Sequence, residues 1–237
     1  MKIITWNCNM AFRKKANTIL TENPDILIVP ECESIDRLNI DEMILRPSDV
    51  FWYGDNPNKG LGVFAFGNYS IEKLEIHNPV FRYVIPLRIY NEHREFFVLA
   101  VWTQKPIKSD FYVVQIWNAV NYYSELLDQE NIIIAGDFNS NSIWDKPRKE
   151  ATHSNTVNFL ALKNIQSAYH HYNGVEHGKE VHMTHHLQRK IEKGFHIDYC
   201  FISANLIKNL TKVEVGLHHN WTNQSDHNPL IIHIEFI

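Results

Sequence analysis

The sequence contains few cysteines and no cysteine pairs. Its 237 residues include only Cys8, Cys32 and Cys200, and an odd, widely spaced set is not the disulfide framework of a small secreted domain. A chain of this length can bury a core that needs neither disulfides nor a structural metal. Strand alternation should turn Cys8 and Cys32 away from their polar neighbours, so we expect both to be buried structural thiols.

Long apolar runs and flexible linkers are also missing. No stretch approaches the roughly 18 residues of a membrane span, and Ile3-Ile4 is too short for a signal-peptide core. Glycine and proline, nine of each, are scattered along the chain, which argues against a long linker. We therefore expect one domain over residues 1–237, a cytoplasmic location, no membrane association and no obligate protein partner.

Positive charge is not in excess, because the formal net charge is −4 at pH 7. A protein that coats DNA without specificity is usually basic. A local basic patch on an acidic body can still bind nucleic acid. The charge balance therefore argues against tight, non-specific duplex binding, but it leaves a nucleic-acid substrate open.

Histidine is abundant, with fourteen residues in the chain. Seven of them fall in one stretch: His170, His171, His177, His182, His185, His186 and His196. A structural zinc site usually combines closely spaced cysteines and histidines. No cysteine lies inside this stretch, so we expect a solvated loop and predict no zinc site there.

Apolar patterns predict strands and helices in mixed order. The chain opens with a strand at 3–8, a helix at 11–22 and a strand at 26–29, a βαβ unit that brings the ends of its two strands side by side. Further strands are predicted at 62–66, 70–76, 83–90, 95–102, 131–135, 196–203, 211–217 and 230–236, and helices at 109–128 and 155–164. Two packed mixed sheets with outer helices are the natural solution for this α/β pattern.

Polar side chains follow or precede the apolar strands at four points. They are Asn7 and Asn9, Glu31, Gly136-Asp137-Phe138-Asn139, and Asp226-His227. Ligands tend to bind at strand ends in such sheets. Extended backbone would point Asp137 and Asn139 the same way. Each position alone has an ordinary structural explanation, such as a turn, and the set is more informative than its members.

The ordered set resembles the endonuclease/exonuclease/phosphatase superfamily, which has the DNase I-like fold. The resemblance runs from Thr5 to about Pro229 and rests on Asn7, Glu31, Asp137-x-Asn139, Ile197-Asp198-Tyr199 and Ser225-Asp226-His227. It implies a four-layered α/β sandwich of two packed mixed β-sheets with outer helices. It also implies a metal-dependent phosphoesterase.

The resemblance assigns a role to each matching residue. Glu31 would be the main ligand of Mg²⁺, with Mn²⁺ as the alternative, and Asn7, Asn9 and Asp226 would complete the metal site. Asp137 would orient or deprotonate the attacking water, while Asn139 and Asn7 would bind phosphate oxygens. Asp198 would hydrogen-bond His227, which would touch the phosphate. A hard cation with oxygen ligands and a charged histidine both stabilise the negative charge that grows during phosphoester hydrolysis.

Two positions depart from the family pattern. The strand at 95–102 ends in Trp102, where a Tyr or His is usual, and an indole can bind substrate but cannot act as an acid. His196 stands where an Arg often precedes the Ile-Asp pair. The first departure affects assistance to the leaving group and leaves the metal site unchanged.

Three functions remain open from the sequence. The first is a nuclease that hydrolyses DNA phosphodiester bonds, with Trp144 and Trp221 stacking on bases and Lys146, Arg148 and Lys149 meeting the backbone. The same tryptophans could instead be core residues, and the charges a solvated loop. The second is a phosphatase or phosphodiesterase for a small phosphorylated metabolite or a lipid headgroup, and the third is an inactive phosphate-binding module. A basic groove beside the site would favour the first function, and a closed, neutral pocket the second.

Overall fold

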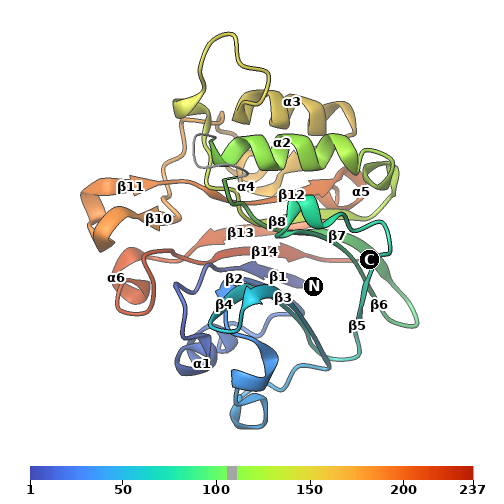
Figure 1. Ribbon diagram of the computed structural model, residues 1–237, viewed down its shortest axis with the longest axis vertical. Helices are drawn as coiled ribbons and strands as arrows, with labels where there is room; N and C mark the ends of the chain where they lie inside the picture. The colour runs from blue at the N-terminus through green and yellow to red at the C-terminus, as the bar shows by residue number, and fades with distance from the viewer. Residues whose placement is uncertain (106–110, 237) are drawn as a thin grey trace.

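The computed structural model describes residues 1–105 and 111–236. Two six-stranded sheets pack face to face (Figure 1). The first sheet contains, in spatial order, β13 (Leu210–Val215), β14 (Leu230–Ile234), β1 (Lys2–Thr5), β2 (Ile26–Cys32), β4 (Lys59–Ala65) and β3 (Asp49–Asn56). The second contains β5 (Ser70–Lys73), β6 (Val84–Tyr90), β7 (Glu95–Trp102), β8 (Ile132–Asp137), β12 (Asp198–Ser203) and β9 (Ile165–Ser167). A separate ribbon pairs β10 (His185–His186) with β11 (Gly194–Phe195).

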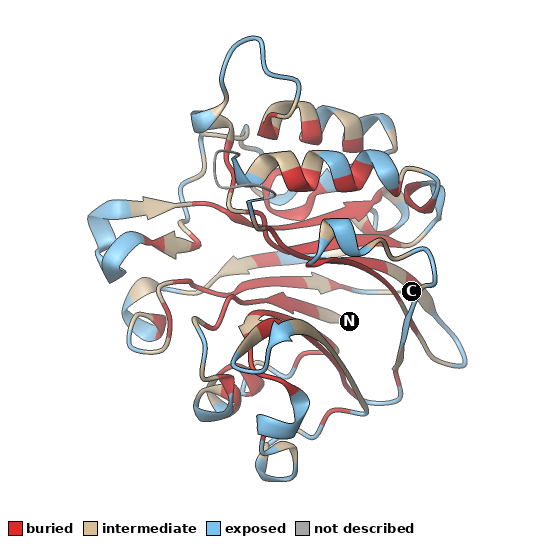
Figure 2. Cartoon of the chain, viewed as in Figure 1, coloured by how far each residue is buried: buried red, intermediate tan, exposed pale blue. Residues whose placement is uncertain are grey.

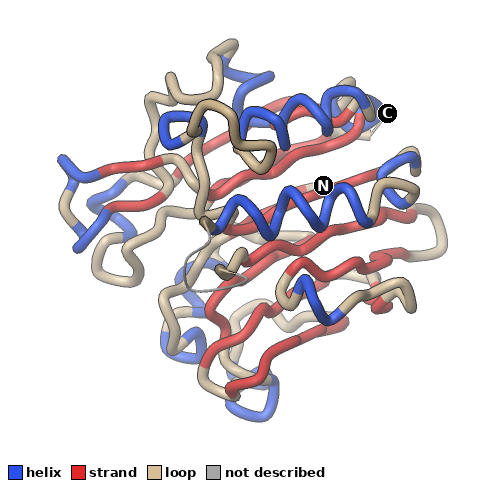
Figure 3. Tube along the Cα trace, turned by 45° about the horizontal axis from the view of Figure 1, so that its top comes forward, coloured by secondary structure: helices blue, strands red, loops and turns tan. Residues whose placement is uncertain are grey.

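Helices lie outside the two sheets. They are α1 (Ala16–Leu20), α2 (Tyr112–Tyr122), α3 (His153–Leu162), α4 (Ala168–Asn173), α5 (Ala204–Ile207) and α6 (His218–Trp221). The longest, α2 and α3, run beside each other over the second sheet (Figure 3), and their apolar residues share a buried cluster with the outer face of that sheet. Another cluster joins α1 and Trp221 to the first sheet. The predicted four-layered sandwich is confirmed.

The main core lies between the sheets, where the strands are almost completely buried (Figure 2). The opening βαβ unit is present, because β1 and β2 pair in parallel with Ile3 opposite Ile26. A second parallel pair, β7 and β8, places Trp102 opposite Asp137. Continuous apolar runs in these strands agree with burial on both faces. Each pair ends in polar residues, which sets up the site described below.

Some predicted elements differ from the structure. The helix expected at 11–22 is divided into a 3₁₀ turn, Phe12–Lys14, and the short α1, because Lys15 has φ −124° and leaves the helical region. The helix expected at 109–128 ends as an α-helix at Tyr122 and resumes as the 3₁₀ turn Leu126–Asp128. Its predicted start, at 109 and 110, falls outside the described residues.

The histidine-rich stretch is not the solvated loop that we expected. It contributes α4, β10 and β11, and His170, His186 and His196 are buried. The ring of His170 is satisfied on both nitrogens, by Ser167 and by Glu180. The cysteines agree with prediction, since Cys8 and Cys32 are both completely buried. Among the described residues no helix is long and apolar enough to cross a membrane.

Candidate active site

The predicted residues gather at one end of the two sheets. Asn7 follows β1, and Glu31 lies near the end of β2. Asp137 ends β8 while Asp198 begins β12, and the antiparallel register of these strands puts the two aspartates opposite each other. His227 lies just before β14. Strands distant in sequence therefore deliver their polar ends to a single place.

The backbone at β8 is shaped for this arrangement by Gly136. Its φ is +143°, and a Cβ atom there would lie 1.8 Å from the carbonyl oxygen of Val101, so only glycine allows β7 and β8 to approach this closely. The backbone then turns at Asn139, whose φ of 46° is left-handed. The extended backbone expected between Asp137 and Asn139 is therefore wrong. Asn139 nevertheless faces Asp137, because its backbone and side-chain N–H groups donate to the two carboxylate oxygens at 2.9 and 3.0 Å.

Asn7 connects two of the carboxylates. Its amide nitrogen lies 3.0 Å from Asp137 Oδ2 and 3.4 Å from Glu31 Oε1. Glu31 has a left-handed φ of 62°, at the point where the register between β2 and β4 shifts, a conformation that is uncommon and strained for a residue other than glycine. With the backbone in this conformation, the carboxylate of Glu31 contacts Asn7, and Lys59 Nζ lies 3.2 Å from its Oε2.

The predicted contact between Asp198 and His227 is present, with 2.8 Å between Asp198 Oδ2 and His227 Nδ1. Burial by itself would lower the pKa of His227, but the Asp198 carboxylate and the nearby Asp137 raise it to about 10. Burial, followed by repulsion from Asp198, raises the pKa of Asp137 to about 7, although His227 and the amides of Asn7 and Asn139 oppose this shift. A charged imidazolium and a carboxyl group that titrates near neutrality thus lie side by side.

Asp226 occupies a more open part of the site. Asn9 Nδ2 donates to its Oδ1 at 2.9 Å, and His185 Nε2 lies 3.8 Å from Oδ2. Burial would raise the pKa of this carboxyl, but His185 and the charge on His227 hold it well below its usual range. Asp226 therefore stays ionised.

A hard divalent cation fits the accessible carboxylates. The side chains of Glu31 and Asp226 are 18% and 29% exposed, whereas Asp137 and Asp198 are buried. Glu31 already attracts the ammonium of Lys59, and Mg²⁺ needs only one or two carboxylates because it keeps several waters. The amide nitrogens of Asn7 and Asn9 point at the carboxylates in this arrangement, so both residues orient acidic groups rather than present their oxygens.

Trp102 lies at the edge of this network. Its side chain is only 4% exposed and packs on Tyr83, with ring centroids 4.7 Å apart. Lys59 Nζ lies 5.1 Å from the centre of the indole ring, so the tryptophan supports the lysine that contacts Glu31. Sequence reasoning missed both Lys59 and His185. Neither follows an apolar run, and only strand pairing brings them to the site.

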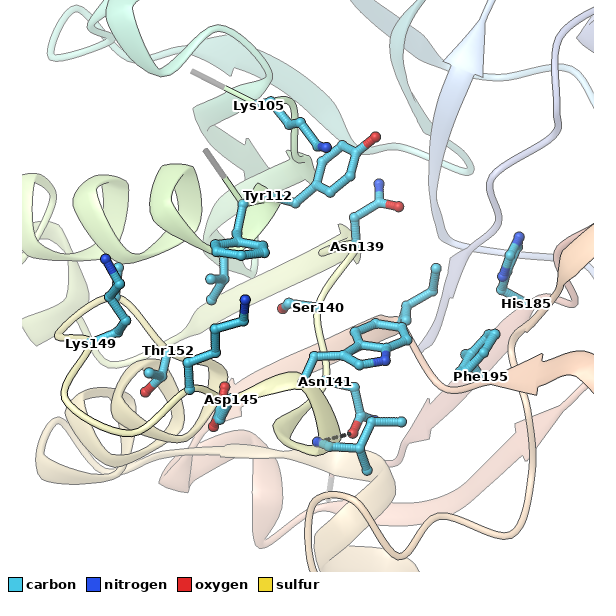
Figure 4. A pocket seen from close by; sticks show the side chains of 17 residues that line it. Lys105, Tyr112, Asn139, Ser140, Asn141, Asp145, Lys149, Thr152, His185 and Phe195 are labelled. Carbon is cyan, nitrogen blue, oxygen red and sulfur yellow. Dashed lines mark hydrogen bonds between the residues drawn. The ribbon is translucent and has the colours of Figure 1, made fainter. Parts of the chain in front are cut away.

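A pocket of about 650 Å³ opens beside Asn139 and Ser140 (Figure 4). Lys105 and Tyr112 lie on one side of these residues, and His185 and Phe195 on the other. The pocket combines three lysines with four aromatic residues, and its lining includes Lys105, Lys146, Lys149, Phe111, Tyr112, Trp144 and Phe195.

Two tryptophans were candidates for stacking on bases, and only one is placed for it. Trp144 is 47% exposed and lines the pocket, where its ring lies 5.0 Å from that of Phe195. Trp221 is 7% exposed and packs edge-on against Trp6 at 5.2 Å, so it is a core residue and the stacking role is wrong for it. Arg148 is exposed but does not line the pocket.

Buried carboxylates, a charged His–Asp pair and an accessible acidic edge at the strand ends of a two-sheet sandwich define a phosphoester hydrolase. The chain belongs to the Endonuclease/Exonuclease/phosphatase family, whose sequence model matches residues 4–227. Among curated proteins, no sequence matches this chain significantly.

Solved structures with the same fold cover almost the whole chain. A 3′ phosphatase, NExo from Neisseria, bound to a product DNA hairpin, is 17% identical with a TM-score of 0.71, and both chains are covered completely. The catalytic domain of APE2 from Xenopus laevis is 16% identical with a TM-score of 0.70, over 99% of this chain and 91% of that one. The endonuclease domain of TRAS1, a telomere-specific non-LTR retrotransposon, is 15% identical with a TM-score of 0.66, over 99% and 98%. At these identities the likeness shows the fold.

Proposed function

We propose that the protein is a Mg²⁺-dependent nuclease that hydrolyses phosphodiester bonds of DNA. The observation that carries this proposal is the pocket beside Asn139, whose lining contains both lysines and aromatic residues. Lysines attract a phosphate backbone, and aromatic faces stack on bases. A nucleic-acid strand uses both kinds of group at once, whereas a small phosphoester would leave most of this surface empty.

Asp137 is the residue that we assign to the attacking water. Its carboxyl is fixed by Asn7 and Asn139, and its pKa of about 7 suits a group that accepts a proton at neutral pH. Burial in the site keeps bulk water away from the carboxylate. Asp137 thereby positions one water molecule and takes its proton as the oxygen attacks phosphorus.

His227 is the residue that we assign to the phosphate. Its Nδ1 is held by Asp198, which leaves Nε2 as the donor for a phosphate oxygen. Because the Asp198 carboxylate raises the pKa of His227 to about 10, the ring carries a positive charge at neutral pH. A fixed charge of this kind stabilises the negative charge that accumulates on the phosphoryl oxygens in the transition state.

Glu31 and Asp226 are the residues that would hold Mg²⁺. When bound, the ion would neutralise phosphate charge and stabilise the leaving oxygen. Asn7 and Asn9 keep the two carboxylates in place, and the chain of hydrogen bonds from Glu31 through Asn7 and Asn9 to Asp226 makes the acidic edge one unit.

Similar structures support a DNA substrate. NExo has been solved with a DNA hairpin, and this chain shares its fold. The alternatives from the sequence are less well supported. A phosphatase for a small metabolite or a lipid headgroup would favour a closed, neutral pocket, and the pocket beside Asn139 is lined by lysines. An inactive module would have no need of a histidine held at 2.8 Å by a buried aspartate.

A substrate panel tests the proposal. The purified protein is incubated with abasic duplex, plain duplex, single-stranded DNA and small phosphoesters, with Mg²⁺ and with EDTA. We expect Mg²⁺-dependent cleavage of at least one DNA substrate and much slower turnover of the small esters. Turnover of a small phosphoester without cleavage of any nucleic acid would instead assign the protein to the second function.

The pocket has its own test, with Trp144→Ala and Tyr172→Ala as a matched pair. Both side chains are aromatic and about half exposed, but only Trp144 lines the pocket. Loss of one stacked base costs about 1–3 kcal/mol, so Trp144→Ala should weaken DNA binding by about 5- to 150-fold. Tyr172→Ala should leave the dissociation constant unchanged. Equal effects of the two substitutions on the dissociation constant would show that the pocket does not bind DNA through Trp144.

A further inference from the structure

A second cluster of metal-ligating side chains lies outside the active site. It comprises His170 on α4 together with His177 and Glu180 in the segment that follows. One ligand atom from each of these three residues lies within 4.8 Å of the other two. His170 Nε2 donates to Glu180 Oε1 at 3.0 Å. The side chains of His170 and Glu180 are only 7% and 5% exposed, so the cluster is a buried feature of the fold.

The histidines of the cluster are oriented by hydrogen bonds on their other ring nitrogens. His170 Nδ1 lies 2.7 Å from Ser167 Oγ, which leaves Nε2 facing Glu180. His177 Nδ1 shares a hydrogen bond with His153 Nε2 at 3.0 Å. Metal-binding histidines are usually held in this way, because a partner on one nitrogen fixes the ring and directs the other nitrogen to the ion.

An additional nitrogen near the cluster is buried without a partner. His196 is 1% exposed, and its Nε2 makes no hydrogen bond among the described residues. The other nitrogen, Nδ1, lies 2.8 Å from the carbonyl oxygen of His182. The ring of His196 lies 5.7 Å from that of His170. A buried polar atom without a partner is costly, and a metal ion would provide one.

The segment that carries His177 and Glu180 contains no helix or strand between Gly174 and Thr184. Side chains hold much of it in place: Glu180 also accepts from Asn141 at 3.1 Å and from the backbone of Gly178 at 3.0 Å. A cavity of about 250 Å³ is lined by His170 and His177 and gives access to the cluster. A metal ion here would cross-link this segment to α4.

We propose that His170, His177 and Glu180 bind a structural Zn²⁺ ion at a site separate from the acidic edge at Glu31. His196 lies outside the group of atoms that approach within 4.8 Å of one another, and its unpaired Nε2 would become the fourth ligand after the ring moves toward the ion. Two or three imidazoles with one carboxylate suit zinc, whereas the oxygen-rich edge at Glu31 suits magnesium. The rings of His170 and His177 are stacked 3.5 Å apart in this arrangement. Binding would replace the His170–Glu180 hydrogen bond by two metal bonds and separate the two rings.

Zinc binding is tested directly with the full chain. The protein is treated with a chelator, dialysed against Zn²⁺ in the presence of excess Mg²⁺, and analysed for metal content. We expect one zinc per chain. His177→Gln should weaken zinc binding by about 100-fold or more, because changes outside the ligand set already cost about 10- to 100-fold. His219→Gln is the control: this histidine is exposed and lies outside both the cluster and its cavity, so its loss should leave zinc binding unchanged.

The wild-type protein provides a second measurement that depends on no variant. Co²⁺ in a tetrahedral site of nitrogen and oxygen ligands absorbs visible light far more strongly than Co²⁺ in an octahedral oxygen site. We expect the strong spectrum, its displacement by Zn²⁺, and a rise of Tm with zinc, since a ligand that binds only the folded chain stabilises it. The proposal would be overturned by a weak octahedral spectrum, by a failure to retain zinc in Mg²⁺, or by equal zinc affinity of wild type and His177→Gln. The cluster would then be only a hydrogen-bonded network of histidines.

Discussion

The acidic residues of the active site differ in their surroundings. Asp137 and Asp198 are buried, and burial with mutual repulsion raises the pKa of Asp137 to about 7. Glu31 and Asp226 reach solvent, and neighbouring histidines hold the pKa of Asp226 low. One site therefore contains a carboxyl group that titrates near neutrality beside Asp226, which remains charged, and this is the division that the proposed metal-assisted hydrolysis needs.

The first prediction at the residue scale concerns the pair Asp198 and His227. Asp198→Asn keeps the shape of the side chain but removes the charge that favours imidazolium, so we expect the cleavage rate to fall by about two to four decades. His227→Ala should cost a similar amount. The double variant should be little slower than either single one, because residues that act as a unit are not additive. Fully additive losses in single-turnover rates would show that the two residues act independently.

The second prediction concerns the metal at Glu31. Glu31→Gln removes the negative charge that faces Lys59 and the solvent, so Mg²⁺ affinity and activity should fall together, and raising the Mg²⁺ concentration should restore part of the rate. Glu75→Gln, an exposed carboxylate elsewhere, serves as the control. Unchanged half-saturation by Mg²⁺ with full activity would remove Glu31 from the metal site.

The sequence predicted the residues that meet at the active site but missed part of what surrounds them. Asn7, Asp137 and Asp198 follow or begin apolar strands, so their position was visible in the pattern. Lys59 and His185 were not visible, because their place in the site depends on pairing between β2 and β4 and on the isolated bridge between His185 and His227. Such contacts depend on the register of distant strands, which composition and periodicity do not encode.

At the scale of elements, the central strands were predicted well, whereas two edge strands, β3 and β9, were missed. β7 was predicted with its observed bounds, Glu95–Trp102, because its run of apolar residues is covered on both faces. β3 was missed although it contains the apolar run 50–53; it lies at the edge of its sheet, and none of its residues is fully buried. The short α4 was missed because its histidines suggested a solvated loop.

The histidine cluster around α4 leads to a prediction for acid stability in the metal-free protein. Burial lowers the pKa of His153 and His196 to about 4 and that of His177 to about 2. Histidines in the unfolded chain have pKa values near 6.5, so below about pH 6.5 the unfolded chain binds more protons than the folded chain. The free energy of unfolding therefore falls as pH falls from about 6.5 to about 4. The slope is at most about 1.4 kcal/mol per pH unit for each histidine.

Denaturant unfolding in the presence of a chelator checks this prediction. His153→Gln should make the loss of stability between these pH values shallower, because one buried imidazole no longer resists protonation. His171→Gln should keep the wild-type slope, since that ring is exposed. If His153→Gln and wild type lose stability in parallel, the buried imidazoles do not control acid unfolding.

At the scale of the whole molecule, the charge distribution limits how nucleic acid can bind. The net charge is −4, yet three lysines line a single pocket. DNA affinity should therefore depend on salt with a slope that corresponds to roughly two to five phosphate contacts. Lys146→Ala should reduce the slope by about one contact, while Lys208→Ala, outside the pocket, should not. A slope typical of many contacts would indicate a binding surface well beyond this pocket.

The whole fold was predictable because the motif residues occur in order along nearly the entire chain, from Asn7 to His227. The central claim is that these residues form one hydrolytic site for DNA. The most direct test is the Mg²⁺-dependent cleavage rate of a DNA oligonucleotide by wild-type protein and by His227→Ala, purified side by side. We predict a loss of about two to four decades in the variant with its Tm nearly unchanged. Equal rates for the two proteins, or no cleavage by wild type, would contradict this account.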